Sequence, residues 1–170
     1  MIYPGAMPIP EFIVSLREKI GHDLLWLPGV SIVVFDDEDR VLLGRRADNG
    51  RWGVVSGIPE PGEQPAVAAV RECVEETGVR PEVLGLCRVF AEEPFAFPNG
   101  DRCVFMGMTF VGRADAEAAA SACVGDEEST AVGWFDRDDL PSPLLASTPR
   151  RIEAALAWRA DPVRAAGFEL

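Results

Sequence analysis

The sequence predicts an α/β (α+β) fold in which helices cover a β-sheet. Runs rich in β-branched residues alternate along the chain with segments whose apolar residues follow a helical spacing. The chain has 170 residues, 48% of them hydrophobic, which is enough to bury a core without disulfides or structural metals. Apart from one alanine-rich stretch it contains no repeat or low-complexity tract, so one continuous domain is the simplest organisation.

The N-terminal segment has the spacing of a short helix. Its apolar residues recur every four positions, at Phe12, Leu16 and Ile20. They follow Pro10 and stop before Gly21, which fits an amphipathic helix with a glycine just past its end. We therefore expect residues 1–28 to form a helical extension that packs on the domain or on a second subunit, and residues 29–170 to form the domain itself.

Apolar or alternating runs predict β-strands at residues 30–35, 41–43, 88–97, 103–111 and 131–135. The acidic residues 36–39 separate the first two runs, which predicts a hairpin. Between the third and fourth runs the chain reads Pro98-Asn99-Gly100-Asp101, and Asn-Gly between two such runs is a strong signal for another hairpin. The sheet is therefore expected to contain at least these two hairpins.

Two further helices are predicted. Residues 65–77 begin with a proline and are followed by Gly78, and a C-terminal helix opens at Thr148-Pro149. The C-terminal helix is expected to pack through Ile152, Ala155, Leu156 and Ala160. We expect the alanine-rich residues 114–122 in or beside a surface loop.

The composition excludes several classes of partner and site. A net charge of −12 makes a nucleic-acid backbone an unfavourable partner. The cysteines form no C-x-x-C pair and a single histidine accompanies them, which argues against a zinc site and favours reduced, mostly buried thiols. The N-terminus lacks a basic residue ahead of an apolar run, and the longest uncharged apolar run is too short to span a membrane. We therefore expect a cytoplasmic protein.

Residues 65–77 are predicted to carry an anionic face. At about 100° per residue, Glu72, Glu75 and Glu76 gather on one side of the helix. The opposite stripe, expected to face the core, consists of Val67, Val70 and Val74. The glutamates repel one another, and only Arg71 offsets this locally. Such a face is usually solvated, yet it also offers the oxygen ligands that Mg²⁺ or Mn²⁺ takes beside substrate phosphates.

The residues around this helix decide between the two interpretations. From residue 57 to residue 79 the chain reads G-x5-E-x7-R-E-U-x-E-E-x-G-U, where U is apolar. The specified positions are Gly57, Glu63, Arg71, Glu72, Cys73, Glu75, Glu76, Gly78 and Val79. This stretch resembles the signature motif of the Nudix hydrolases at every specified position, and the resemblance extends more loosely over most of the chain. It implies the Nudix fold, a mixed β-sheet sandwiched between helices.

The resemblance also implies a reaction and a metal site. Nudix hydrolases cleave a nucleoside diphosphate linked to another moiety, through attack of water on phosphorus with Mg²⁺ or Mn²⁺ as cofactor. Carried over by position, Glu72 and Glu76 are direct metal ligands, and Glu75 is a third ligand or a bridge through water. The backbone carbonyl of Ser56 is a further candidate ligand. Structural roles fall to the remaining motif residues, Gly57, Glu63, Arg71 and Gly78, with Glu63 and Arg71 expected to pair.

The general base is left open by the resemblance. The family takes it from the motif, here Glu75 or Glu76, or from a glutamate on a later loop. Glu128 is the candidate on such a loop, and its alternative role is a solvated loop acid. The sequence does not decide between these positions.

Candidate substrate contacts are of two kinds. Three arginines lie before the motif, Arg45, Arg46 and Arg51. One or more could bring a guanidinium to a phosphate, although the usual role of such an arginine is a surface residue that keeps the protein soluble. Phe95 and Phe97 are expected on one strand face, where a ring could stack on a nucleobase or fill the core.

The resemblance narrows the substrate to nucleotides. ADP-ribose or a related sugar nucleotide is favoured, because Pro94 lies fifteen residues past Val79, similar to the proline that marks the ADP-ribose pyrophosphatase subgroup. The alternative is a sanitising pyrophosphohydrolase of nucleoside triphosphates, oxidised ones included. A non-catalytic nucleotide-sensing module would be expected to lack the motif acids that this chain retains. A homodimer is compatible with the family resemblance.

Overall fold

The computed structural model describes residues 10–97, 99–163 and 166. Within them the helices are α1 (Glu11–Ile20), α2 (Pro65–Thr77), α3 (Ala116–Ala120) and α4 (Thr148–Ala160). The strands are β1 (Leu25–Phe35), β2 (Val41–Arg46), β3 (Trp52–Gly53), β4 (Val55–Gly57), β5 (Glu82–Ala91), β6 (Phe95–Ala96), β7 (Arg102–Arg113) and β8 (Ser129–Phe135). No helix formed by these residues is both long enough and apolar enough to cross a lipid bilayer.

The strands form one mixed sheet. Its main order is β3-β2-β1-β7-β5, while β4 pairs with β1, β6 with β7 and β8 with β2. β1 and β7 are parallel along the whole of β1, and the other pairs are antiparallel. The mixed α/β class is therefore confirmed, as are the hairpins β1–β2 and β5–β7 and the last strand, β8. Pro98 of the second hairpin turn and residues 1–9 of the expected extension lie outside the described residues.

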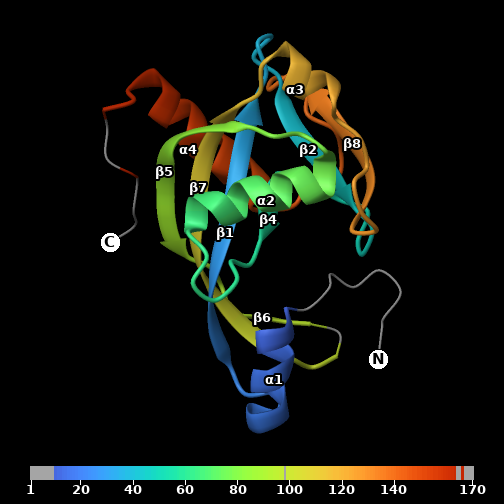
Figure 1. The fold of residues 1–170 in the computed structure, drawn as a ribbon, viewed down its shortest axis with the longest axis vertical. Helices are drawn as coiled ribbons and strands as arrows, with labels where there is room; N and C mark the ends of the chain where they lie inside the picture. The colour runs from blue at the N-terminus through green and yellow to red at the C-terminus, as the bar shows by residue number, and fades with distance from the viewer. Residues whose placement is uncertain (1–9, 98, 164–165, 167–170) are drawn as a thin grey trace.

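Helices cover both faces of this sheet. α2 crosses one face and α4 lies against the other (Figure 1). Ile32 and Val34 of β1 belong to the core beneath α2, whereas Val33 and Phe35 belong to the core beneath α4. Successive strand residues point to opposite faces, so a strand covered on both sides must be apolar at every position. This explains the unbroken apolar run in the second half of β1 and confirms the expected sandwich.

Helix α1 of the expected extension packs on the first half of β1. α1 lies below the main body beside β6 (Figure 1), and Ile13 forms a small apolar cluster with Leu27 and Cys103. The Arg17 side chain fastens this helix: its Nη1 donates to the carbonyls of Gly21 and Asp23 at 3.1 and 2.6 Å. The helix expected to stop before Gly21 is thus present, and it packs on β1, which already begins at Leu25.

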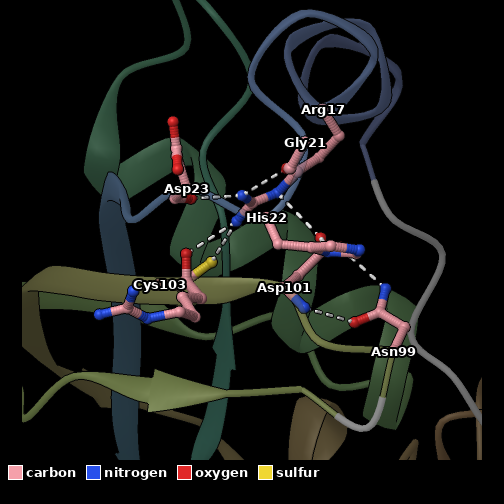
Figure 2. Close-up of polar contacts among 8 residues, drawn as sticks. Arg17, Gly21, His22, Asp23, Asn99, Asp101 and Cys103 are labelled. Atoms are coloured by element: carbon pink, nitrogen blue, oxygen red, sulfur yellow. Dashed lines mark hydrogen bonds and ion pairs between the residues drawn. The ribbon is translucent and has the colours of Figure 1, made fainter.

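Asp101 connects the same helix to the hairpin between β6 and β7 (Figure 2). Its carboxylate accepts hydrogen bonds from His22 Nδ1 at 2.9 Å and Asn99 Nδ2 at 2.8 Å, and it lies 3.4 Å from Arg17 Nε. Burial alone would raise the pKa of Asp101, but the hydrogen bonds from His22 and Asn99 and the charge of Arg17 outweigh it and lower that pKa. His22 thus has a structural contact with this hairpin.

Several expectations about local structure are wrong. The alanine-rich residues 114–122 contain helix α3, because alanine favours helix and the Asp115 carboxylate accepts a hydrogen bond from the Ala118 N–H at the first turn. The strand expected at residues 88–97 starts earlier, at Glu82, and is interrupted between β5 and β6, where Pro94 has no N–H for the ladder. In α4, Ala160 is exposed because it lies in the last turn.

Candidate active site

Helix α2 positions most of the motif acids. It begins with Pro65 and ends at Gly78, whose φ of 70° is left-handed and whose N–H donates to the Val74 carbonyl. The residues that α2 buries are small: Ala68, Ala69, Cys73 and Thr77. Small side chains allow the helix backbone to lie close to β1 and β4, which are its main neighbours.

The valine stripe of α2 does not face the core. Val67 is 58% exposed, and Val70 and Val74 are half-buried. The prediction that these residues form the core face is wrong, because apolarity alone ranks valine above alanine whereas close packing on the sheet selects small residues. The glutamate face therefore flanks the buried face, and two of its carboxylates turn towards the sheet.

Glu72 and Glu76 are the inward carboxylates. A Cβ at Gly57 of β4 would stand 2.6 Å from Glu72 Cγ and closer still to its carboxyl group, so the acid fills the space beside that glycine. Glu76 Oε2 lies 4.0 Å from the corresponding Cβ position at Gly44 of β2. Both glutamates therefore occupy the narrow space between α2 and the sheet instead of bulk solvent.

Arg71 organises the outer side of the motif. Its Nε and Nη2 donate to the two carboxylate oxygens of Glu63 at 2.9 and 3.0 Å, which is the expected pairing. Its Nη1 lies 3.0 Å from Glu72 Oε1 and 2.9 Å from Glu75 Oε2, and Nη2 reaches the Ile58 carbonyl at 3.4 Å. The hydrogen bonds from Arg71 lower the pKa of Glu63. The loop before α2 is thus fastened to the helix.

Glu128 joins the motif acids from a separate segment. Its N–H donates to Asp126 Oδ1 at 2.9 Å, and its carbonyl accepts from the Ala47 N–H at 2.7 Å. Burial, together with the negative charges of Asp126 and Glu72, raises the pKa of Glu128 to about 7. The loop glutamate singled out from the sequence is therefore part of the same electrostatic cluster as the helix.

Burial and mutual repulsion also act on the two inward helix acids. The pKa of Glu76 is raised well above its usual value, first by burial and then by the charges of Glu128, Glu72 and Asp126. Burial raises the pKa of Glu72 as well, although Arg71 opposes it. Grouped, half-desolvated carboxylates of this kind are typical of functional sites.

The chemistry of these donors fits a hard divalent cation. Carboxylate oxygens are the ligands that Mg²⁺ and Mn²⁺ prefer, and a cation would offset the repulsion among Glu72, Glu76 and Glu128. Glu72 is paired with Arg71 here, so a cation would compete with that arginine. In the described part of the chain no trio of acidic, histidine or cysteine side chains is already gathered closely enough to hold a metal. Ser56, in β4 opposite Ser31, adjoins this region through its neighbour Gly57.

The three candidate arginines differ in position. Arg46 donates to Asp48 at 2.9 and 2.8 Å. Burial alone would lower the pKa of Arg46, but the hydrogen bond to Asp48 and the negative charges of Asp48, Glu76 and Glu128 outweigh burial and raise this pKa. Arg45 Nε binds the Gly50 carbonyl and Arg51 Nη1 the Leu144 carbonyl, each through a structural contact. The structure thus brings Arg46 close to the acids and gives the other two roles in neighbouring loops.

The two candidate phenylalanines lie near the extension. Their ring centroids are 4.3 Å apart. Phe97 packs on the cluster of Ile13 and Leu27, while Phe95 is 46% exposed. The packing of Phe97 favours a structural role, and Phe95 has the freer ring.

Sequence reasoning missed two residues beside Glu128. Asp126 adds charge to the cluster, and Gly125 donates its N–H to the Glu76 carbonyl at 3.0 Å. The only local signal was the acidic run that Asp126 begins. Nothing in the spacing indicated that this loop contacts α2.

Known proteins are similar to this chain over most of its length. Residues 25–156 match the family model of the NUDIX domain. A MutT-like protein of Streptomyces ambofaciens is 32% identical over 135 residues, which cover 79% of this chain and 80% of that protein. The 8-oxo-dGDP phosphatase NUDT18 of Mus musculus is 31% identical over 140 residues, 81% of this chain but 39% of the mouse protein.

Solved structures agree with the sequence comparisons. The MutT NUDIX hydrolase from Burkholderia pseudomallei superposes with a TM-score of 0.59 and 29% identity, over 76% of this chain and 98% of that one. The NUDIX domain of Shewanella oneidensis NrtR, solved with ADP ribose, has a TM-score of 0.60 and 21% identity over 89% of this chain and 98% of that one. The second similarity supports the fold alone. With the family model covering residues 25–156, the chain belongs to the Nudix hydrolase family.

Proposed function

We propose that this chain hydrolyses the pyrophosphate bond of a nucleotide and that the reaction requires Mg²⁺ or Mn²⁺. The observation that carries the proposal is the convergence of Glu72, Glu76 and Glu128 from two separate segments, with raised pKa values. Burial of like charges costs free energy, so a fold that keeps them together indicates a ligand of opposite charge. The family relationship supports the same reaction class.

Glu72 and Glu76 would hold the cation, with Glu75 as a third ligand or a contact through water. The Ser56 carbonyl would be a further donor. When bound, the cation would neutralise the diphosphate and lower the pKa of the attacking water. Because Arg71 already contacts Glu72 and Glu75, this chain orients its acids before the substrate arrives.

Glu128 is our candidate general base. With a pKa of about 7, its carboxylate is well matched to accept a proton near neutral pH. Glu75 and Glu76 are the alternatives within the motif. Arg71 Nη1 lies 2.9 Å from Glu75 Oε2, so this oxygen is already engaged and less available to an attacking water. Arg46, close to the acids, is the arginine we expect to contact a substrate phosphate.

We favour an oxidised purine nucleoside di- or triphosphate as the substrate. The similarity to a MutT-like protein and to an 8-oxo-dGDP phosphatase supports this class. The preference for ADP-ribose depends on Pro94, which lies exposed between β5 and β6. ADP-ribose is the second candidate, because a NUDIX domain of similar fold was solved with it.

A substrate panel tests the proposal. The purified chain would be incubated with 8-oxo-dGTP, 8-oxo-dGDP, GTP, ADP-ribose and CDP-choline, with Mg²⁺ or with EDTA, and the products separated. We expect Mg²⁺-dependent turnover, which Glu128→Gln lowers by roughly 100-fold or more. Glu127→Gln, on the exposed neighbour in the same loop, is the matched control. Tight binding without turnover of any substrate would contradict the proposal and favour the sensing module.

A further inference from the structure

The C-terminal end of α2 is capped by a distant segment of the chain. We call residues 121–125 the capping segment. The Cys123 N–H donates to the Thr77 carbonyl at 2.9 Å, and the Gly125 N–H donates to the Glu76 carbonyl at 3.0 Å. The last carbonyls of a helix have no partner within the helix, so the capping segment supplies the donors that they need. This couples the helix that carries the motif acids to the loop that carries Glu128.

At Gly125 the capping segment lies so close to α2 that there is no room for a Cβ atom. A Cβ at position 125 would overlap the carbonyl oxygen of Glu75 and stand 3.0 Å from its carbonyl carbon. These are backbone atoms of a helix, so they cannot move aside as a flexible side chain would. Any side chain at Gly125 must therefore displace the capping segment from α2.

The displacement would be transmitted directly to Glu128. After Gly125 the chain turns at Asp126, whose Oδ1 accepts the Glu128 N–H at 2.9 Å. On its other side, Glu128 is fixed by the bond from the Ala47 N–H to its carbonyl at 2.7 Å. Glu128 is thus held between α2 and the residue that follows β2, and only two residues separate it from Gly125, where the added Cβ would clash.

We propose that Gly125 and Asp126 are positioning residues that place Glu128 opposite the inward acids of α2. The inference rests on the proposed function for the role of Glu128. Gly125 sets the distance between the loop and the helix, and Asp126 sets the direction in which Glu128 leaves the loop. Neither residue needs to touch the substrate, because both act through Glu128.

Gly125→Ala is the first test, with Gly29→Ala as the matched control. A Cβ at Gly29 would meet only ordinary contacts, the closest being Phe105 Cδ1 at 3.4 Å. We expect Gly125→Ala to lower kcat by roughly 10- to 100-fold with KM within a few-fold of wild type, since a misplaced catalytic group loses rate more than binding. Gly29→Ala is expected to keep both constants. Wild-type kcat in Gly125→Ala would overturn the proposal.

A double-mutant cycle tests whether Gly125 acts through Glu128. If it does, Gly125→Ala should add little to the loss already caused by Glu128→Gln. If the loss of kcat in the double variant instead equals the product of the two single losses, Gly125 has a structural role independent of Glu128, and the proposal is overturned. Unchanged turnover of Glu128→Gln would overturn both this inference and the base assignment, whereas a loss in Glu128→Gln with wild-type turnover in Gly125→Ala would overturn this inference alone.

Asp126 gives a second test that keeps the Gly125 backbone. Asp126→Ala removes the acceptor for the Glu128 N–H, while Asp126→Asn retains an oxygen at that place. We expect kcat to fall in Asp126→Ala and to be largely restored in Asp126→Asn. Equal losses in both variants would show that the charge matters instead of the hydrogen bond, and would overturn the positioning role of Asp126.

Amide hydrogen exchange supplies a readout that needs no turnover. In the wild-type chain, peptides covering residues 121–128 should contain slowly exchanging amides, because the N–H groups of Cys123 and Gly125 are bound to α2 and that of Glu128 to Asp126. Gly125→Ala should speed exchange in these peptides and leave those from β7 unchanged. Slow exchange in the variant would overturn the proposal, whatever the substrate proves to be.

Discussion

The carboxyl group of Glu72 occupies the space in which a side chain at Gly57 would begin. Gly57→Ala should therefore displace Glu72 and lower kcat by about 100-fold. Steady-state kinetics check this, and the double variant Gly57→Ala with Glu72→Gln should be no slower than Glu72→Gln alone. Turnover of Gly57→Ala at the wild-type rate would show that the acid has room elsewhere.

Arg71 should resist conservative replacement. Its planar fork binds both oxygens of Glu63, and a lysine ammonium can offer only a point charge there. We expect Arg71→Lys to lower the free energy of unfolding by about 1–2 kcal/mol in urea denaturation. Arg113→Lys is the control, because its pair with Asp37 is exposed and should contribute less than about 0.5 kcal/mol. Equal losses in the two variants would contradict the argument.

The Asp101 network predicts a dependence of stability on pH. Because the pKa of Asp101 is lowered in the folded protein, its ionised carboxylate stabilises the fold above the unfolded pKa of about 3.9. This contribution should be lost as pH falls through the lower, folded pKa. Urea titrations from about pH 6 to about pH 3 should show the difference between wild type and Asp101→Asn shrinking. A constant difference would mean that the charge of Asp101 is not stabilising.

Removal of divalent metal should lower thermal stability as well as activity. A ligand that binds only the folded chain at 100 times its Kd adds about 2.7 kcal/mol, so Mg²⁺ or Mn²⁺ should raise the Tm of the EDTA-treated protein. Differential scanning fluorimetry measures the shift. Glu72→Gln and Glu76→Gln should reduce it, whereas Glu127→Gln should keep it. An equal shift in all variants would place the ion elsewhere.

Local signals in the sequence predicted most of the elements. Proline and glycine marked both ends of α2, and Asn99-Gly100 marked a hairpin, because these residues restrict their own backbone. The short strands β3 and β4 were not predicted, since each depends on a partner strand instead of its own two or three residues. Whether a side chain is buried also depends on the element packed against it. For this reason the valines of α2 were wrongly predicted to face the core.

The residues of the candidate site also fall into those that local spacing predicted and those that depend on contacts between distant segments. The motif spacing located the helix acids and the pairing of Arg71 with Glu63, two residues that are eight positions apart. Glu128 was singled out as the candidate on a later acidic loop, but the motif spacing did not link it to the helix. The contact between Gly125 and α2 joins segments about fifty residues apart. No local pattern in a single sequence predicts a contact over that separation.

The alanines on the inner side of α2 have a consequence for engineering. Ala68 and Ala69 are almost fully buried and make the gap between helix and sheet narrow. Larger apolar residues there could be chosen to improve packing, yet they would lift Glu72 and Glu76 away from the strands. Attempts to raise thermostability at these positions should therefore trade turnover for heat resistance, because one narrow gap sets both.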